Sequence, residues 1–237
     1  LAIEGCIFRD LKEGGLKVYN ESNVSLTDVV FSGCSSPGEG GAIYVDDSAV
    51  SLTRVTLDGN EARDGGAIYV DSSDTPSLTV TASTFVANVA TGGHGGAISM
   101  TASAGAIIVA GSTFEFNAAD DTGGAIYSTS ATVDFADSIF SGNTSDDIGG
   151  ALHFSGIEDV LLTSVALSGN SAREGAGAEI WSCGSATLDD VSFLTNLGAW
   201  WGAGLNFENC TATISHSEFA GNNADRGSGA LTLWESE

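Results

Sequence analysis

Apolar and polar residues alternate along most of this chain, in short runs that are typical of β-strands. Ile43 and Val45 flank a tyrosine, and Val50, Leu52 and, further on, Leu57 continue the alternation. Successive side chains of a strand point to opposite faces, whereas a helix needs apolar residues three or four positions apart. The pattern predicts three short strands in each repeating unit.

Each unit ends in the motif Phe-x-x-Asn. The motif occurs as Phe85/Asn88, Phe114/Asn117, Phe140/Asn143, Phe193/Asn196 and Phe219/Asn222, with Leu57/Asn60 and Leu167/Asn170 as conservative variants and Phe31/Cys34 as the first member. Its last position recurs at intervals of 26 to 29 residues. A unit of this size cannot bury its own apolar face, so we expect neighbouring units to stack.

A second motif, Gly-Gly-Ala-Ile-Tyr-Val, follows each Asn after a short variable loop. It spans residues 40–45 and 65–70, with variants at 95–100, 123–128, 149–154, 175–180, 202–207 and 228–233, and Gly14-Gly15-Leu16 is an earlier relic. Glycine suits a tight bend that needs positive φ or a close approach of two backbones. The motif therefore predicts a bend that is repeated in every unit.

Together the two motifs predict an all-β fold, a right-handed parallel β-helix of about eight to nine coils. Each coil has 25–30 residues and three short strands, and coils stack at roughly 4.8 Å per layer. We expect residues 1–237 to form a single β-helix domain that is a segment of a longer parent chain. In such a stack the asparagines form an inward amide ladder, which comprises Asn60, Asn88, Asn117, Asn143, Asn170, Asn196 and Asn222.

The paired Gly-Gly-Ala-Ile and Phe-x-x-Asn motifs resemble the repeats of the chlamydial polymorphic membrane proteins and of similar bacterial surface β-helices. The resemblance covers essentially the whole chain, from about Gly14 to Leu233. It implies an extracellular β-helix, like the passenger of an autotransporter, that is used in adhesion or as a surface scaffold.

The net charge of the chain argues against some classes of partner. Seven Lys or Arg face 31 Asp or Glu, which gives a formal net charge of −24. A surface of this sign repels the phosphate backbone that supplies most nucleic-acid affinity, so we expect no nucleic-acid partner. The sequence also has no apolar run of ~18 residues, so we expect no direct membrane insertion.

Two cysteines are one repeat apart. Cys183 and Cys210 precede matching strands, and stacking brings them within disulfide range. We predict a disulfide between them, which indicates an oxidising compartment. Cys6 and Cys34 occupy different columns, and we expect them to be core thiols, with a bridge as the alternative if the first coil is irregular.

Many enzymes that cut acidic polysaccharides share this fold, so catalytic carboxylates are the main rival hypothesis. Adjacent pairs occur at Asp46/Asp47, Asp120/Asp121, Asp146/Asp147 and Asp189/Asp190. Asp is common in turns for hydrogen-bonding reasons, and the Arg, Lys and His residues are scattered over the repeat. We therefore assign no catalytic residue.

Calcium is the one cofactor that the sequence suggests, because acidic turns stacked on one another offer oxygen ligands. Asp120, Asp121, Asp146 and Asp147 are the weak candidates for such a surface site. No calcium-loop motif accompanies them, and a solvated acidic edge is the alternative.

Two groups of aromatic residues are candidates for contact with a partner. One is a column that we expect to face outward, formed by Tyr44, Tyr69, Ser99, Tyr127, His153, Glu179, Asn206 and Thr232. It could stack sugars or pack against a partner, or it could be a surface ladder that favours β-structure. The other is Trp200-Trp201, because adjacent exposed tryptophans often mark a contact.

These features lead us to expect a non-catalytic extracellular structural scaffold or adhesin module, secreted or at the cell surface, as part of a rod or filament. Its partner would be a protein or glycan on a surface, or neighbouring copies in an assembly. The alternative is a polysaccharide-active β-helix enzyme, either a glycoside hydrolase or a lyase.

Overall fold

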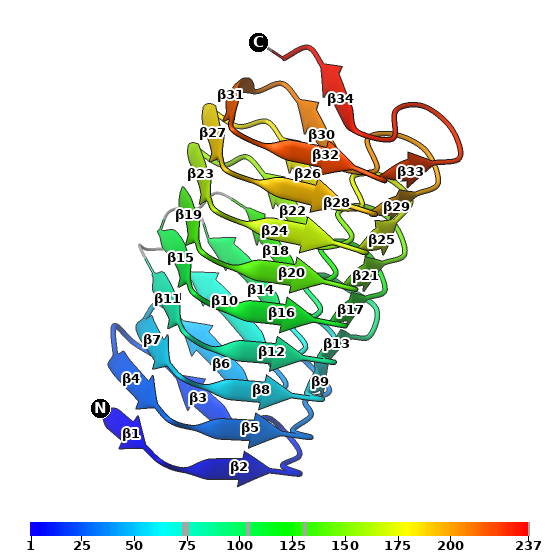
Figure 1. Ribbon diagram of the computed structural model, residues 1–237. Helices are drawn as coiled ribbons and strands as arrows, with labels where there is room; N and C mark the ends of the chain where they lie inside the picture. Colours follow the sequence, from blue (N-terminus) through cyan, green and yellow to red (C-terminus); the bar gives the residue numbers. More distant parts are fainter. Residues whose placement is uncertain (73–75, 103–104, 130–131, 237) are drawn as a thin grey trace.

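The computed structural model describes residues 1–72, 76–102, 105–129 and 132–236, and over these ranges the chain winds into nine stacked coils (Figure 1). Each strand pairs in parallel with the strand one coil before or after it. The described residues contain no helix. The predicted right-handed parallel β-helix is confirmed.

Four sheets run along the stack, and we name them A to D in the order in which a coil passes through them. Sheet A consists of β1 (Ala2–Glu4), β4 (Asn23–Thr27), β7 (Ala49–Thr53), β11 (Ser77–Thr81), β15 (Ala106–Ala110), β19 (Thr132–Ala136), β23 (Asp159–Thr163), β27 (Ser185–Asp189) and β31 (Thr211–Ser215). Sheet B consists of β2 (Ile7–Arg9), β5 (Val30–Ser32), β8 (Thr56–Asp58), β12 (Thr84–Val86), β16 (Thr113–Glu115), β20 (Ile139–Ser141), β24 (Ala166–Ser168), β28 (Ser192–Leu194) and β32 (Glu218–Ala220). Sheet C consists of β9 (Glu61–Ala62), β13 (Val89–Ala90), β17 (Ala118–Ala119), β21 (Thr144–Ser145), β25 (Ser171–Ala172), β29 (Leu197–Gly198) and β33 (Asn223–Ala224). Sheet D consists of β3 (Leu16–Val18), β6 (Ile43–Asp46), β10 (Ile68–Ser72), β14 (Ile98–Ala102), β18 (Ile126–Thr129), β22 (Leu152–Ser155), β26 (Ala178–Trp181), β30 (Leu205–Glu208) and β34 (Leu231–Trp234).

Sheet C is the difference from the predicted three strands per coil. Its strands are two residues long and follow directly after the Asn of each coil. Two residues are too few to show an alternating pattern, so these strands leave no signal in the sequence. In the first two coils single bridges, from Lys12 to Ser35 and from Ser35 to Glu61, extend the same line of pairing.

The two motifs lie in register from coil to coil. Phe85 of β12 pairs with Phe114 of β16, and Ile68 of β10 pairs with Ile98 of β14. Because one repeat makes one coil, each motif position becomes a column along the stack. The period of the sequence therefore fixes the register of the sheets.

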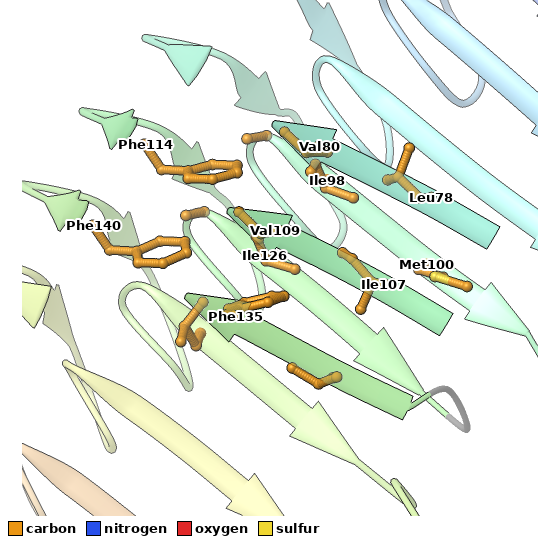
Figure 2. Packing of buried hydrophobic residues seen from close by; sticks show 14 of the residues in the cluster. Leu78, Val80, Ile98, Met100, Ile107, Val109, Phe114, Ile126, Phe135 and Phe140 are labelled. Carbon is orange, nitrogen blue, oxygen red and sulfur yellow. The ribbon is translucent and has the colours of Figure 1, made fainter. Parts of the chain in front are cut away.

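The interior of the coils is filled by inward-facing side chains from sheets A, B and D. Figure 2 shows Phe114 and Phe140 from sheet B facing Phe135 from sheet A, with Ile126 from sheet D beside them. The rings of Phe114 and Phe140 are stacked, with centroids 4.7 Å apart, and both side chains are fully buried. Burial of each such side chain stabilises the fold by roughly 1.5–3 kcal/mol.

The corners between sheets A and B use the left-handed backbone conformation. One residue with positive φ lies at this corner in each coil: Gly5, Asp28, Arg54, Ala82, Gly111, Asp137, Ser164, Asp190 and His216. Asp tolerates this conformation better than most residues, because its short side chain can hydrogen-bond locally. The corner geometry therefore accounts for an Asp at this position in several coils.

The two glycines of the second motif have different roles. Gly65 has a φ of +59°, a conformation that L-residues rarely adopt. Gly66 has no positive φ, but a Cβ atom there would lie only 2.5 Å from the carbonyl oxygen of Val89 in the next coil. The first glycine therefore makes the bend, and the second allows neighbouring coils to approach.

Candidate functional site

The Asn column forms a continuous amide ladder at the corner between sheets B and C. The side-chain Nδ2 of Asn117 donates to Oδ1 of Asn143 at 2.9 Å and to the carbonyl oxygen of Phe85 at 3.1 Å. Its Oδ1 accepts from the backbone N and from Nδ2 of Asn88, at 3.0 and 2.9 Å. One side chain therefore ties together three coils.

The same pattern repeats along the column, with Nδ2 to Oδ1 distances of 2.9–3.0 Å. The residues linked in this way are Asn60, Asn88, Asn117, Asn143, Asn170, Asn196 and Asn222. The first six have no exposed surface, and Asn222 is half-buried. Buried amides with all these partners hold the coils in register.

A second polar ladder, which sequence analysis missed, lies at the corner between sheets A and B. The hydroxyl oxygen of Ser112 accepts from the backbone N of Ser83 at 3.1 Å, and that of Ser138 accepts from the backbone N of Ser112 at 3.2 Å. The signal was present in the repeat, because each of these serines stands two residues before the aromatic position of sheet B.

Cys183 and Cys210 lie in adjacent coils at the corner between sheets D and A, and they form a disulfide with a Cα–Cα distance of 4.8 Å. Cys34 is a buried free thiol at the start of the Asn column, where its backbone N donates to Oδ1 of Asn60 at 3.0 Å. Cys6 is free and exposed. The expectation of a core thiol was wrong for Cys6, because strand β2 beside it is covered by a single neighbouring strand, β5.

The outer column of sheet D is not the exposed surface that we expected. Four residues of this column have at most 7% of their surface exposed: Ser99, His153, Glu179 and Asn206. The other four are partly buried: Tyr44, Tyr69, Tyr127 and Thr232. The bend before each strand of sheet D lies against this face. A Cβ atom on Gly149 would lie 2.8 Å from the Cβ of His153, and one on Gly175 would lie 2.8 Å from the Cβ of Glu179.

Aromatic stacking continues through this covered column. The ring centroids of Tyr44 and Tyr69 are 5.8 Å apart, and those of Tyr127 and His153 are 5.3 Å apart. Above Tyr127 on the other side lies His94, which comes from a loop and stacks at 4.4 Å, beside the small Ser99. Tyr44 therefore packs against Tyr69 and Tyr19, and Tyr127 packs between two histidines.

Burial perturbs two ionisable groups of the column. Desolvation lowers the pKa of His153 to about 4, with a further contribution from His94. Desolvation raises the pKa of Glu179 to about 8, against the hydrogen bond that Asn206 Nδ2 donates to its Oε1 at 2.9 Å. Both side chains are therefore neutral near pH 7. They lie in adjacent coils but beneath the loops, where a polymer cannot reach them.

The four calcium candidates do not converge. Asp147 pairs with Arg173, and Asp121 Oδ2 lies 3.4 Å from Nδ1 of His94. Asp120 and Asp146 are exposed on separate coils. Within the ranges that the structure describes, no three His, Cys, Asp or Glu side chains are placed to hold a metal ion.

The other acidic pairs occupy corners. Asp47 and Asp190 have φ values of 44° and 56°, which places them in left-handed bends. Asp189 accepts from His216 Nδ1 at 2.6 Å, which lowers the pKa of this carboxyl and raises that of the imidazole. This ion pair is exposed and joins residues of adjacent coils. The pair of Arg54 and Asp28, at 2.7 Å, does the same. The acidic pairs therefore have a structural explanation.

Trp200 and Trp201 lie in a loop between sheets C and D and are 39% and 38% exposed. The guanidinium of Arg173 lies over the ring of Trp200, 4.8 Å from its centroid. Trp201 meets Trp234 of β34 edge to face, with centroids 5.9 Å apart. Sequence analysis missed Trp234 and its equivalent Trp181, although alignment of the second motif places both at the same repeat position.

The fold and these columns define a class of protein, the right-handed β-helix built from stacked repeats. The chain belongs to the family described as right handed beta helix region, whose model matches residues 1–145. The Chlamydia polymorphic membrane protein repeat matches residues 137–155, which carry one copy of each motif. The resemblance to the chlamydial proteins is therefore confirmed. Comparison with curated proteins and with solved structures found no match.

Proposed function

We propose that this chain is a non-catalytic scaffold or adhesin module that acts outside the cell. The observation that carries the proposal is the amide ladder, because it shows that the residues defining the repeat are used to stack coils. The polymorphic membrane protein repeat supports a surface-type module. A repeat that serves stacking leaves the outer loops to contact a partner.

The disulfide supports an oxidising setting. Disulfides persist in secreted and surface proteins, whereas cytosolic reductants keep thiols reduced. Cys183 and Cys210 join two successive coils of the stack, where a bridge resists unwinding of the β-helix. The net charge of −24 keeps such a surface soluble and repels anionic polymers.

The outer surface of the stack is where we expect a partner to bind. The loops between sheets C and D, which Figure 1 shows as the connections between these strands, carry Trp200 and Trp201. Exposed tryptophans at such a position favour contact with a partner. The tyrosines of the covered column support the loops from beneath.

Antibodies against the purified chain test where the protein acts. They should bind intact source cells, or detect the chain in the medium, before any permeabilisation. Signal that appears only in permeabilised cells would exclude a surface module.

A panel of neutral and acidic polysaccharides tests the absence of catalysis. Neither new reducing ends nor unsaturated uronates should accumulate beyond the rate without protein. Steady product from any one polymer would establish the alternative, a polysaccharide-active enzyme.

A further inference from the structure

All four tryptophans of the chain lie in the last three coils, on the side of sheet D and its covering loops. We call Trp181, Trp200, Trp201 and Trp234 the tryptophan face. Their exposed fractions are 46%, 39%, 38% and 47%. Large aromatic side chains that remain this exposed and lie together are uncommon on a surface without a partner.

Glu208 lies between two of these rings. It pairs with Trp181 in the coil before and with Trp234 in the coil after, so that the three side chains occupy one outward column of sheet D. Neighbouring strands are roughly 4.8 Å apart, and the two indoles therefore flank the carboxylate on both sides. Trp201 extends the aromatic surface through its edge-to-face contact with Trp234.

Glu208 forms no ion pair with the described residues. Burial raises the pKa of Glu174 and of Glu179, and the negative charge of Glu208 raises both further because like charges repel; Arg173 Nε, 3.8 Å from Glu174 Oε1, offsets part of the rise at Glu174. Glu179 is 5% exposed, and its Oε2 has no hydrogen-bond partner; this oxygen lies on the side of Gly175, next to Glu174. An added cation would relieve this repulsion.

Of the two arginines in this part of the chain, one already has partners and the other lies in a separate loop. Arg173 pairs with Asp147, has its Nε 3.8 Å from Glu174 Oε1 and lies over Trp200. Arg226 is exposed in the following loop and forms no ion pair with the described residues. The contact of Arg173 with Trp200 shows that an indole of this surface accepts a guanidinium.

We infer that the tryptophan face binds a basic protein segment, with a Lys or Arg side chain seated on Glu208 between Trp181 and Trp234. The net charge of −24 would steer such a segment toward the chain and would oppose contact between two copies. A neutral glycan could stack on the indoles but would leave Glu208 without a counter-charge. The inference names a partner class for the surface module proposed above and rests on that proposal for its biological setting.

The probe is a short peptide of alternating Arg and Gly, compared with the same peptide carrying Gln in place of Arg. Because the tryptophan face holds every Trp of the chain, intrinsic Trp fluorescence reports directly on the site. The Arg peptide should change the emission and bind more weakly as salt is added, and the Gln peptide should do neither.

Substitutions separate the site from the general field of an acidic protein. Trp181→Ser and Trp234→Ser should each weaken binding by about two- to fivefold, as expected for exposed cation–π contacts. Ser is acceptable in this column because Ser155 occupies it one coil earlier. Phe116→Ser is the matched control, since Phe116 is 66% exposed on another side of the stack. It should leave binding unchanged.

A charge control completes the test. Glu208→Gln should weaken binding by about threefold. Asp58→Asn makes the same change of charge at an exposed position of sheet B and should have little effect. Equal losses in both, or no binding of the Arg peptide, would overturn the inference. So would Trp-dependent binding of a neutral oligosaccharide without binding of the peptide. Absence of the chain from the cell surface would instead remove the proposed setting and leave the peptide result standing.

Discussion

Replacing Asn117 by Ala tests the amide ladder at its centre. The side chain of Asn117 makes four hydrogen bonds and has no exposed surface. Its removal leaves the backbone N–H of Asn88 without its acceptor and the carbonyl of Phe85 without this donor. An unpaired buried polar group costs about 1–3 kcal/mol, so we expect a loss of about 3–5 kcal/mol in the free energy of unfolding.

Urea unfolding followed by far-ultraviolet circular dichroism measures this loss. Asn222→Ala is the matched control, because Asn222 makes the same contacts with Asn196 but is half-buried. Water can replace the lost bonds there, and we expect a loss of about 1 kcal/mol. If the Asn117→Ala variant loses less than about 1 kcal/mol, or no more than the control, the amide ladder does not hold the coils together.

Three further predictions concern bends, charge and the disulfide. Gly66→Ala should prevent folding or lower the melting temperature sharply, because its Cβ would collide with the next coil, whereas Gly59→Ala, with positive φ but open space, should cost only about 1 kcal/mol. Glu179→Gln should leave stability nearly unchanged at pH 5 and raise it relative to the parent by about 2–4 kcal/mol at pH 8, measured by urea unfolding at each pH. Reduction of the bond between Cys183 and Cys210, which are 27 residues apart, should lower the free energy of unfolding by about 2–4 kcal/mol in the same assay.

The sign for Glu179 follows from the protons bound in each state. Its pKa is about 8 in the folded chain and lower when unfolded, so the folded state binds the extra proton. The stabilisation is complete below the unfolded pKa and is lost as the pH rises toward 8. A stability difference that shrinks with rising pH would contradict a buried, protonated Glu179. Equal melting temperatures for the two glycine variants, or a reduced protein as stable as the oxidised one, would contradict the other two predictions.

Much of the fold was predictable because one repeat makes one coil. A fixed period turns each sequence motif into a spatial column, so the stacking of Phe114 on Phe140 and the bonding of Asn117 to Asn143 follow from alignment alone. The disulfide between Cys183 and Cys210 follows in the same way, since one repeat separates them.

The burial of the outer column of sheet D was less predictable. His153 and Glu179 are 7% and 5% exposed, and the alternation of apolar and polar residues along the strands does not show that the bend before each strand lies against them. The strands of sheet C are too short to show alternation. Alignment of the repeat places Trp181 and Trp234 in one column, whereas the contact of Trp234 with Trp201 comes from a loop and follows only from the structure.

Cysteine labelling in intact source cells tests the surface proposal most directly. An impermeant maleimide is added before lysis, and the labelled residues are identified by mass spectrometry. We predict that the thiol introduced by Phe116→Cys, at a position that is 66% exposed in a middle coil, is labelled in intact cells, that Cys34 is labelled only after unfolding, and that Cys183 and Cys210 react only after unfolding and reduction. Labelling of the introduced thiol only after lysis, together with reaction of Cys183 and Cys210 without a reductant, would place the chain inside the cell and contradict the proposed surface role.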